Sequence, residues 1–189
     1  MHLLDSVFEE FRGQLGQPDA MNPAKSDPLF YLVYPSALML ELKRRIPIWT
    51  ASLRNDGFQV ERISLSDLLW RLVDESGRWD AWLELEAGAE IEQINEAVRD
   101  VLRSSDRLVD EVATSVSRQS GKTVIFLTEA EMLHPYFRTR VIESKLHDRV
   151  QVPTVIFYPG RRSGQYGLHF LDFYPVDPNY RSTLIGGEL

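Results

Sequence analysis

Residues Thr123 to Gly187 read TVIFLTEAEMLHPYFRTRVIESKLHDRVQVPTVIFYPGRRSGQYGLHFLDFYPVDPNYRSTLIGG. Three apolar runs of strand length, TVIFLT, VPTVIFYP and LHFLDFY, are separated by a helical stretch and then by a glycine-rich turn. Strands that alternate with helices are typical of a parallel sheet covered by helices, whereas a short glycine-containing connection predicts a hairpin. This segment therefore predicts an α/β fold whose last strand returns as a hairpin.

The N-terminal half repeats the same alternation. LFYLVYP at residues 29–35 predicts a strand buried on both faces, and FQVERISL at residues 58–65 predicts another strand. Flanking segments carry apolar residues at helical spacings of three and four: Leu4, Val7, Phe8, Phe11 and Leu15; Leu38, Leu42, Ile46, Trp49 and Leu53; Leu68, Leu69, Leu72 and Val73. Ser36 stands where a helix N-cap is expected, and Ser66 is expected to begin a further helix. Pro47 is expected to bend its helix. Residues 89–119 predict two helices that break at Ser104 to Asp106. Together these elements predict one α/β domain over residues 1–189, a mostly parallel sheet flanked by helices.

Composition limits the class of function. The formal net charge of −7 is a poor match to a phosphate backbone, because nucleic-acid binding depends on clustered Lys and Arg. The chain has no cysteine, which excludes thiol catalysis and zinc sites built on thiolates. Residues 1–12 lack the basic start and apolar core of a signal peptide, and no apolar run reaches the length of a membrane span. We expect a soluble cytoplasmic protein that binds neither nucleic acid nor membrane.

The tetrapeptide SGKT at residues 120–123 looks like the end of a phosphate-binding loop. That motif needs a glycine where Val116 stands, and it must leave a strand and enter a helix. Here a predicted helix comes before it and a strand after it. We therefore expect Gly121 to close a helix rather than to cradle a phosphate.

Glu129 and Glu131 follow the predicted strand TVIFLT, where nucleotide hydrolases place the acid that holds magnesium. Solvated loop acids are the more ordinary interpretation of the same pattern. The four histidines, His2, His134, His147 and His169, lack the spacing that puts two ligands on one helix face, so no metal or cofactor is expected.

The C-terminal stretch FYPGRRSGQYGLHFLDFYPVDPNYR offers candidate binding residues. Arg161 and Arg162 lie among glycines, where an arginine pair clamps an anion or simply forms a hairpin tip. Asn179, Tyr180 and Arg181 follow two prolines, and aromatic and Arg side chains are enriched in interface anchors. We predict partner contacts through Arg161, Arg162, Tyr166, Asn179, Tyr180 and Arg181.

LTEAEMLHPYFRTRVIESKL, VPTVIFYPG, LHFLDF and NYR resemble the BrxB family of bacteriophage exclusion (BREX) phage-defence systems. The resemblance is specific from Leu127 to Arg181 and loose between Ala89 and Gln119. It implies a small non-enzymatic component of an antiviral complex that associates with PglZ, a larger metal-dependent phosphatase-like or nuclease-like protein. The resemblance carries over no catalytic residue.

The order of predicted elements also resembles a RecA-like or AAA-like nucleotide-binding core. The phosphate loop is where the match fails, because Tyr34, Pro35 and Ser36 follow the first strand without glycine or lysine. This predicts a degenerate P-loop core that forms no anion cradle. The alternative is a divergent nucleotide hydrolase that uses Glu129 or Glu131 with Arg161 or Arg162.

Overall fold

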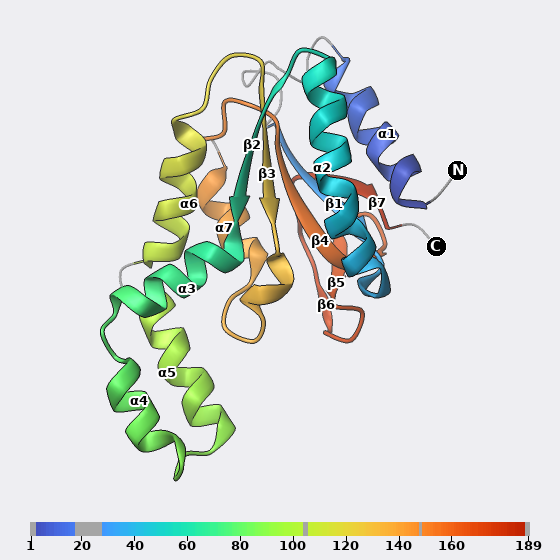
Figure 1. Ribbon diagram of the computed structural model, residues 1–189. Coiled ribbons are helices and arrows are strands. Elements are labelled where there is room, and N and C mark those ends of the chain that lie inside the picture. Colours follow the sequence, from blue (N-terminus) through green and yellow to red (C-terminus); the bar gives the residue numbers. More distant parts are fainter. Residues whose placement is uncertain (1–2, 18–27, 104–105, 148, 188–189) are drawn as a thin grey trace.

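The computed structural model describes residues 3–17, 28–103, 106–147 and 149–187 (Figure 1). The helices are α1 (Leu3–Leu15), α2 (Met39–Asn55), α3 (Leu65–Glu75), α4 (Trp79–Glu86), α5 (Ile91–Arg103), α6 (Arg107–Ser117) and α7 (Thr139–Leu146), with 3-10 turns η1 (Ser36–Leu38) and η3 (Ala130–Leu133). The strands are β1 (Leu29–Tyr34), β2 (Gln59–Ser64), β3 (Thr123–Thr128), β4 (Thr154–Ser163), β5 (Gly167–Phe170), β6 (Val176–Asp177) and β7 (Thr183–Gly186). Within these described residues, no helix is both long and apolar enough to cross a membrane.

The sheet follows the order β2-β3-β4-β1-β7, and each neighbouring pair along this path is parallel. Strand β4 lies at the centre, where Phe157 is opposite Leu32 and Val155 is opposite Phe126. The end of β4 turns into an antiparallel extension with β5 and β6. The prediction of an α/β fold with a mostly parallel sheet is confirmed, and β7 is an edge strand that the sequence did not predict.

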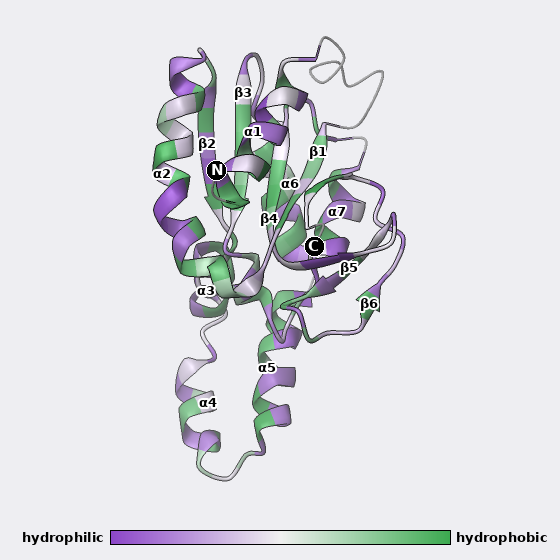
Figure 2. Cartoon of the chain, turned by 90° about the vertical axis from the view of Figure 1, so that its right-hand side faces the viewer, coloured by the Kyte–Doolittle hydropathy of each residue, from purple (hydrophilic) through white to green (hydrophobic). Residues whose placement is uncertain are grey.

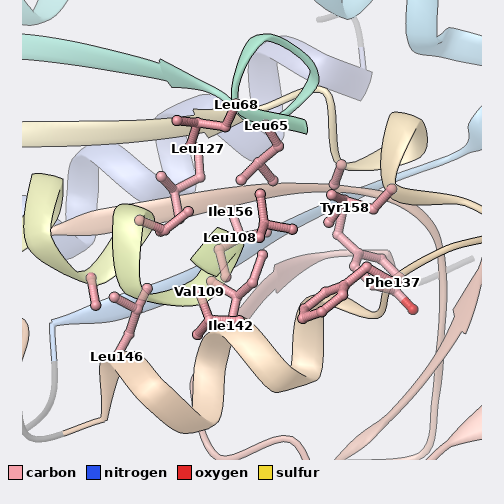
Figure 3. Close-up of a cluster of buried hydrophobic side chains, with 14 of the residues drawn as sticks. Leu65, Leu68, Leu108, Val109, Leu127, Phe137, Ile142, Leu146, Ile156 and Tyr158 are labelled. Atoms are coloured by element: carbon pink, nitrogen blue, oxygen red, sulfur yellow. The ribbon is translucent and has the colours of Figure 1, made fainter. Parts of the chain in front are cut away.

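Each face of the sheet has its own hydrophobic core, because alternate side chains of a strand point to opposite faces. Helices α1 and α2 cover one face, where Leu32, Phe126, Val155 and Phe157 pack. Helices α3, α6 and α7 contribute to the other core (Figure 3), which includes Leu65, Leu68, Leu108, Val109, Leu127, Ile142, Leu146, Ile156 and Tyr158. The apolar stripes predicted for α1 and α3 are buried as expected.

The predicted serine cap at Ser36 is wrong, because Ser36 is the first residue of η1 rather than its cap. Helix α3 begins at Leu65, one residue before the predicted start at Ser66. The cap of α3 is Ser64, whose Oγ accepts a hydrogen bond from the Asp67 amide at 3.0 Å. Helix α2 runs through Pro47, so the proline does not end it.

Helices α4 and α5 form a hairpin that extends beyond the end of the sheet toward which the strand arrows point (Figures 1 and 2). The two predicted helices between residues 89 and 119 are confirmed as α5 and α6. Two residues of the predicted break, 104 and 105, lie outside the described residues, and Asp106 has a left-handed φ of 52°. Helix α4 was not predicted.

Candidate functional site

The carboxyl ends of the strands are the usual ligand site of an open parallel sheet. At the end of β1, the amide and Oγ of Ser36 donate to Oδ2 of Asp172, at 3.0 and 2.5 Å. Asp172 comes from the turn after β5. A carboxylate of the chain itself therefore takes the donors at the start of η1, where a nucleotide-binding fold would present its phosphate loop.

A charged cluster lies at the end of β3. Lys43 Nζ is 3.0 Å from Glu131 Oε1 and 3.7 Å from Glu129 Oε1, and Arg62 Nη2 is 3.2 Å from Glu129 Oε2. Ser64 Oγ donates to the same Glu129 oxygen at 2.5 Å. The hydrogen bond between Lys43 and Glu131 raises the pKa of Lys43, so the ammonium stays charged. The two glutamates are thus countered by two basic side chains.

The cavity beside these glutamates holds about 140 Å³ and includes Tyr34 and Phe157 in its lining. Small-molecule sites are typically about 300 to 1,000 Å³. Neither Arg161 nor Arg162 lines this cavity; Arg161 lines a separate one of about 290 Å³ that also contains Asp172. The structure therefore does not assemble the glutamates and the arginine pair into one pocket.

Ser64 both caps α3 and donates to Glu129, so Ser64→Ala is expected to lower the free energy of unfolding by about 1 to 2 kcal/mol. Ser66→Ala is the matched control, since Ser64 rather than Ser66 caps the helix, and we expect about 0.5 kcal/mol or less. Urea denaturation of the two variants measures both values. An equal loss in both would mean that Ser64 is not the cap.

Residues 120–122 of SGKT lie between α6 and β3, and Thr123 is the first residue of β3, so the predicted order of helix then strand is confirmed. Lys122 Nζ donates to the Asp56 carbonyl at 2.7 Å and lies 4.5 Å from the centre of the Phe58 ring. Gly121 has φ of 70° but lies beyond Arg118, which is the actual C-cap of α6. The expected C-cap role of Gly121 is wrong, and Lys122 ties this turn to the end of α2.

The predicted hairpin is confirmed, although the arginine pair is not at its tip. Arg161 and Arg162 belong to β4, where they are opposite His169 and Leu168 of β5. The turn itself contains Tyr166, which is 55% exposed. Its carbonyl accepts a hydrogen bond from the Tyr180 amide at 3.0 Å, so the turn and the C-terminal tail lie side by side.

Tyr180 is a core residue, so the prediction of an exposed Tyr180 anchor is wrong. Its side chain is 3% exposed and packs edge-on against Tyr31 and Tyr158, with ring centres 5.0 and 6.1 Å apart. Burial raises the pKa of Tyr180 to about 12. Asn179 and Arg181, on either side of Tyr180, are exposed. Together with Tyr166 they stay candidates for contact with a partner protein.

The backbone of this tail is held by Glu143, a buried carboxylate of α7. Its Oε1 accepts from the amides of Arg181 and Ser182 at 3.0 and 2.9 Å and from Ser182 Oγ at 2.5 Å. These bonds fix the chain just before β7. The segment after Pro175 and Pro178 is therefore attached to the core through Glu143.

Metal-binding clusters were not predicted, and in the described ranges no group of three or more His, Asp or Glu side chains is placed to hold a metal ion. His2 lies outside those ranges. His134 contacts the hydroxyl of Tyr174, and burial, with the charge of Arg138, lowers the pKa of His134. The His134 ring also contacts the rings of Phe173 and Tyr174, so His134 belongs to an aromatic cluster.

A groove of about 580 Å³ lies between α4 and α5. Its walls include three of the four tryptophans in the chain, Trp70, Trp79 and Trp82, together with Leu83 and Ile94. The Trp70 and Trp79 rings stack at 6.3 Å, and Trp79 Nε1 donates to Asp74 at 2.7 Å. Contacts within the chain thus orient Trp70 and Trp79 at the groove.

Sequence reasoning missed this groove, although a signal was present. Three tryptophans within residues 70–82 are followed by an acidic stretch, and tryptophan is enriched in interface anchors. The segment carries no motif with a fixed spacing, so only the pairing of α4 with α5 shows that these rings share a cavity.

Comparison with known proteins gives a consistent result across most of the chain. A family model described as "BREX protein BrxB" matches residues 61–185. A protein of Bacillus cereus (strain H3081.97) named "BREX protein BrxB" is 25% identical over 166 residues, which cover 86% of this chain and 81% of that protein. No solved structure matches the chain. The family model covers α3 to α7, strands β3 to β6 and thus the C-terminal hairpin, and the chain belongs to the BrxB family of BREX proteins.

Proposed function

We propose that this BrxB-family chain is a non-catalytic adaptor in BREX phage defence that binds a PglZ-like protein. Family membership supports a role in BREX and association with other BREX components. The adaptor role and the PglZ-like partner are our proposals. The observation that carries them is the apolar groove between α4 and α5, since a preformed exposed apolar surface of this kind marks a binding site.

The polar contacts at the carboxyl ends of the strands support the same proposal. Asp172 takes the donors of Ser36, and Lys43 and Arg62 pair with Glu129 and Glu131. Because these side chains already bind one another, they are not arranged to bind a nucleotide. The proposed likeness to a degenerate P-loop core is compatible with this arrangement and stays a prediction.

The alternative function is a divergent nucleotide hydrolase. It is favoured by one observation, the glutamate pair at the carboxyl end of a buried central-sheet strand. In such an enzyme Glu129 or Glu131 would hold magnesium or orient water. The enzyme would require Lys43 and Arg62 to release these carboxylates when nucleotide binds.

We expect the purified protein to show no ATP or GTP turnover and no nucleotide-dependent rise in melting temperature. A nucleotide at 100 times its dissociation constant would add about 2.7 kcal/mol to the stability, which a thermal shift detects readily. Turnover that disappears in Glu129→Gln or Glu131→Gln, while the exposed-surface variant Glu10→Gln retains it, would establish the hydrolase instead.

Two further measurements test the adaptor directly. Co-expression with the PglZ-like protein of the same operon should give one peak that contains both chains in size-exclusion chromatography. Lys122→Ala should leave phage protection in cells unchanged, because Lys122 serves a turn. Separate elution of the two proteins would contradict the proposed partner.

A further inference from the structure

We propose that the groove between α4 and α5 is the docking site for an amphipathic helical segment of another BREX protein, with Lys and Arg flanking its apolar face. This inference deepens the proposed adaptor function and rests on it for the source of the partner. Beyond that function, we infer where the partner docks and which residue types its docking segment carries.

The hairpin of α4 and α5 leaves large apolar side chains exposed to solvent. None of the eight residues of α4, all of them described, is buried. Leu83 is 62% exposed, Leu85 67% and Ile91 76%. Isolated helices this short are marginal in water, and contiguous exposed apolar patches mark interaction surfaces. A partner that covers these side chains would stabilise the hairpin as it binds.

The α5 side of the groove is attached to the rest of the domain. Val98 of α5 is 6% exposed, and Tyr136, from the loop after η3, closes the wall. Arg99 fastens this loop to α5, since its Nε and Nη2 both donate to the Pro135 carbonyl at 3.4 Å. Val98 therefore joins this side of the groove to the main core, whereas no residue of α4 is buried.

Charge identifies the occupant. From Trp79 to Val98 the sequence contains six carboxylates and no Lys or Arg; they are Asp80, Glu84, Glu86, Glu90, Glu92 and Glu96. Arg99 pairs with two of them, Glu92 at 2.8 Å and Glu96 at 2.6 Å. Its hydrogen bond to Glu92 lowers the pKa of that carboxyl. In the described part of the chain, the other four carboxylates take part in no ion pair. Glu86 lines the groove itself, and the other five carboxylates make the hairpin around it acidic. An apolar segment with basic flanks matches this acidic hairpin, because complementary potentials speed association and reject partners of like charge.

A second copy of this chain is a poor occupant for the same reason. A two-fold contact would bring the same surface of both copies together. The acidic hairpin that carries Leu83 would then face an identical acidic hairpin, and like charges across an interface are costly. The groove therefore suits a different chain.

The dimensions suit a helix. Helix α4 has eight residues, which at 1.5 Å per residue is about 12 Å, or about two helical turns. A segment with apolar residues at i, i+3, i+4 and i+7 presents a face of that length, the usual pattern of a helix bound in a groove.

The test uses the full chain and each of the other BREX proteins of its operon, purified separately. We expect one of them, the PglZ-like protein, to bind the wild type, and Leu83→Glu to weaken binding about tenfold or more, as for a central apolar contact. Glu84→Lys combined with Glu86→Lys should weaken it comparably at low salt, and the difference from wild type should shrink as salt rises. Biolayer interferometry measures these constants.

The controls lie on other elements with matched chemistry. Leu40→Glu places the same charge on an α2 side chain that is 73% exposed, and Glu10→Lys reverses an exposed charge on α1; both should bind as wild type does. Because Leu83 is also largely exposed, all of these variants should keep the wild-type melting temperature. A photocrosslinker at position 83 should attach to a segment of the partner that has more Lys and Arg than Asp and Glu.

The outcomes separate the two proposals. Equal binding of the PglZ-like protein to the wild type and Leu83→Glu would overturn the docking site while the adaptor function stands. Binding of a different BREX protein through the groove would support the docking site and overturn the PglZ-like assignment. Crosslinking to an acidic segment, self-association through position 83, or binding to none of the BREX proteins would overturn the docking inference.

Discussion

Phe157→Ala is expected to lower the free energy of unfolding by about 3 to 5 kcal/mol. Phe157 is 1% exposed in the central strand β4, and its ring lies edge-on to Phe126 at 5.0 Å and stacks with Trp49 at 6.1 Å. Truncation would leave a cavity between the sheet and α2 that these rigid neighbours are unable to fill. The loss is a large part of the total stability of an ordinary domain, which is about 5 to 15 kcal/mol.

Chemical denaturation of the two proteins measures this difference. Phe173→Ala is the matched control, because Phe173 is 68% exposed and its truncation should change the stability by about 0.5 kcal/mol or less. If Phe157→Ala unfolded at the wild-type denaturant concentration, the strand would be peripheral and the assignment of the central core would be wrong.

Tyr180→Ala is expected to cost about 3 to 5 kcal/mol of stability, as for other large buried aromatics. Its ring fills the space between Tyr31 and Tyr158, and its hydroxyl reaches Asp177 only at 3.4 Å. Tyr180→Phe keeps the ring and should therefore cost about 1 kcal/mol or less. Thermal and urea denaturation distinguish these two values.

The neighbouring variants separate core from surface in the tail. Arg181→Ala and Tyr166→Ala alter exposed side chains and should leave the melting temperature nearly unchanged. Only these two variants, together with changes at Asn179, test the tail as a partner contact. A soluble Tyr180→Ala protein with wild-type stability would show that the tail does not pack as described.

The elements most successfully predicted are those in which one local pattern agrees with burial. The run LFYLVY is buried at all six positions, and the stripe from Leu4 to Leu15 is the buried face of α1. Such patterns survive folding because the hydrophobic effect acts on every residue of the run in the same direction. Helix starts were less predictable, since Ser64 and Ser66 are equally good caps by residue type and only the backbone decides between them.

The candidate residues show the same division. Glu129 and Glu131 follow β3 as predicted, yet their partners Lys43 and Arg62 come from α2 and β2, and no sequence spacing links them. Asp172 binds Ser36 across a separation of 136 residues. Tyr180 appeared to be a surface anchor because aromatic and Arg side chains are enriched in interface anchors and the preceding prolines order the backbone. The parallel pairing of β7 with β1 instead draws this tail against the core.

By itself, the sequence determined the alternation of strands and helices, the parallel sheet at its centre and the absence of a phosphate loop after the first strand, because each depends on residue types within one short segment. Only the tertiary structure decided which polar groups neutralise one another at the carboxyl ends of the strands, that Tyr180 is buried, and that three tryptophans line one groove. These features join residues from separate elements, and their energies depend on distances that exist only after the chain has folded.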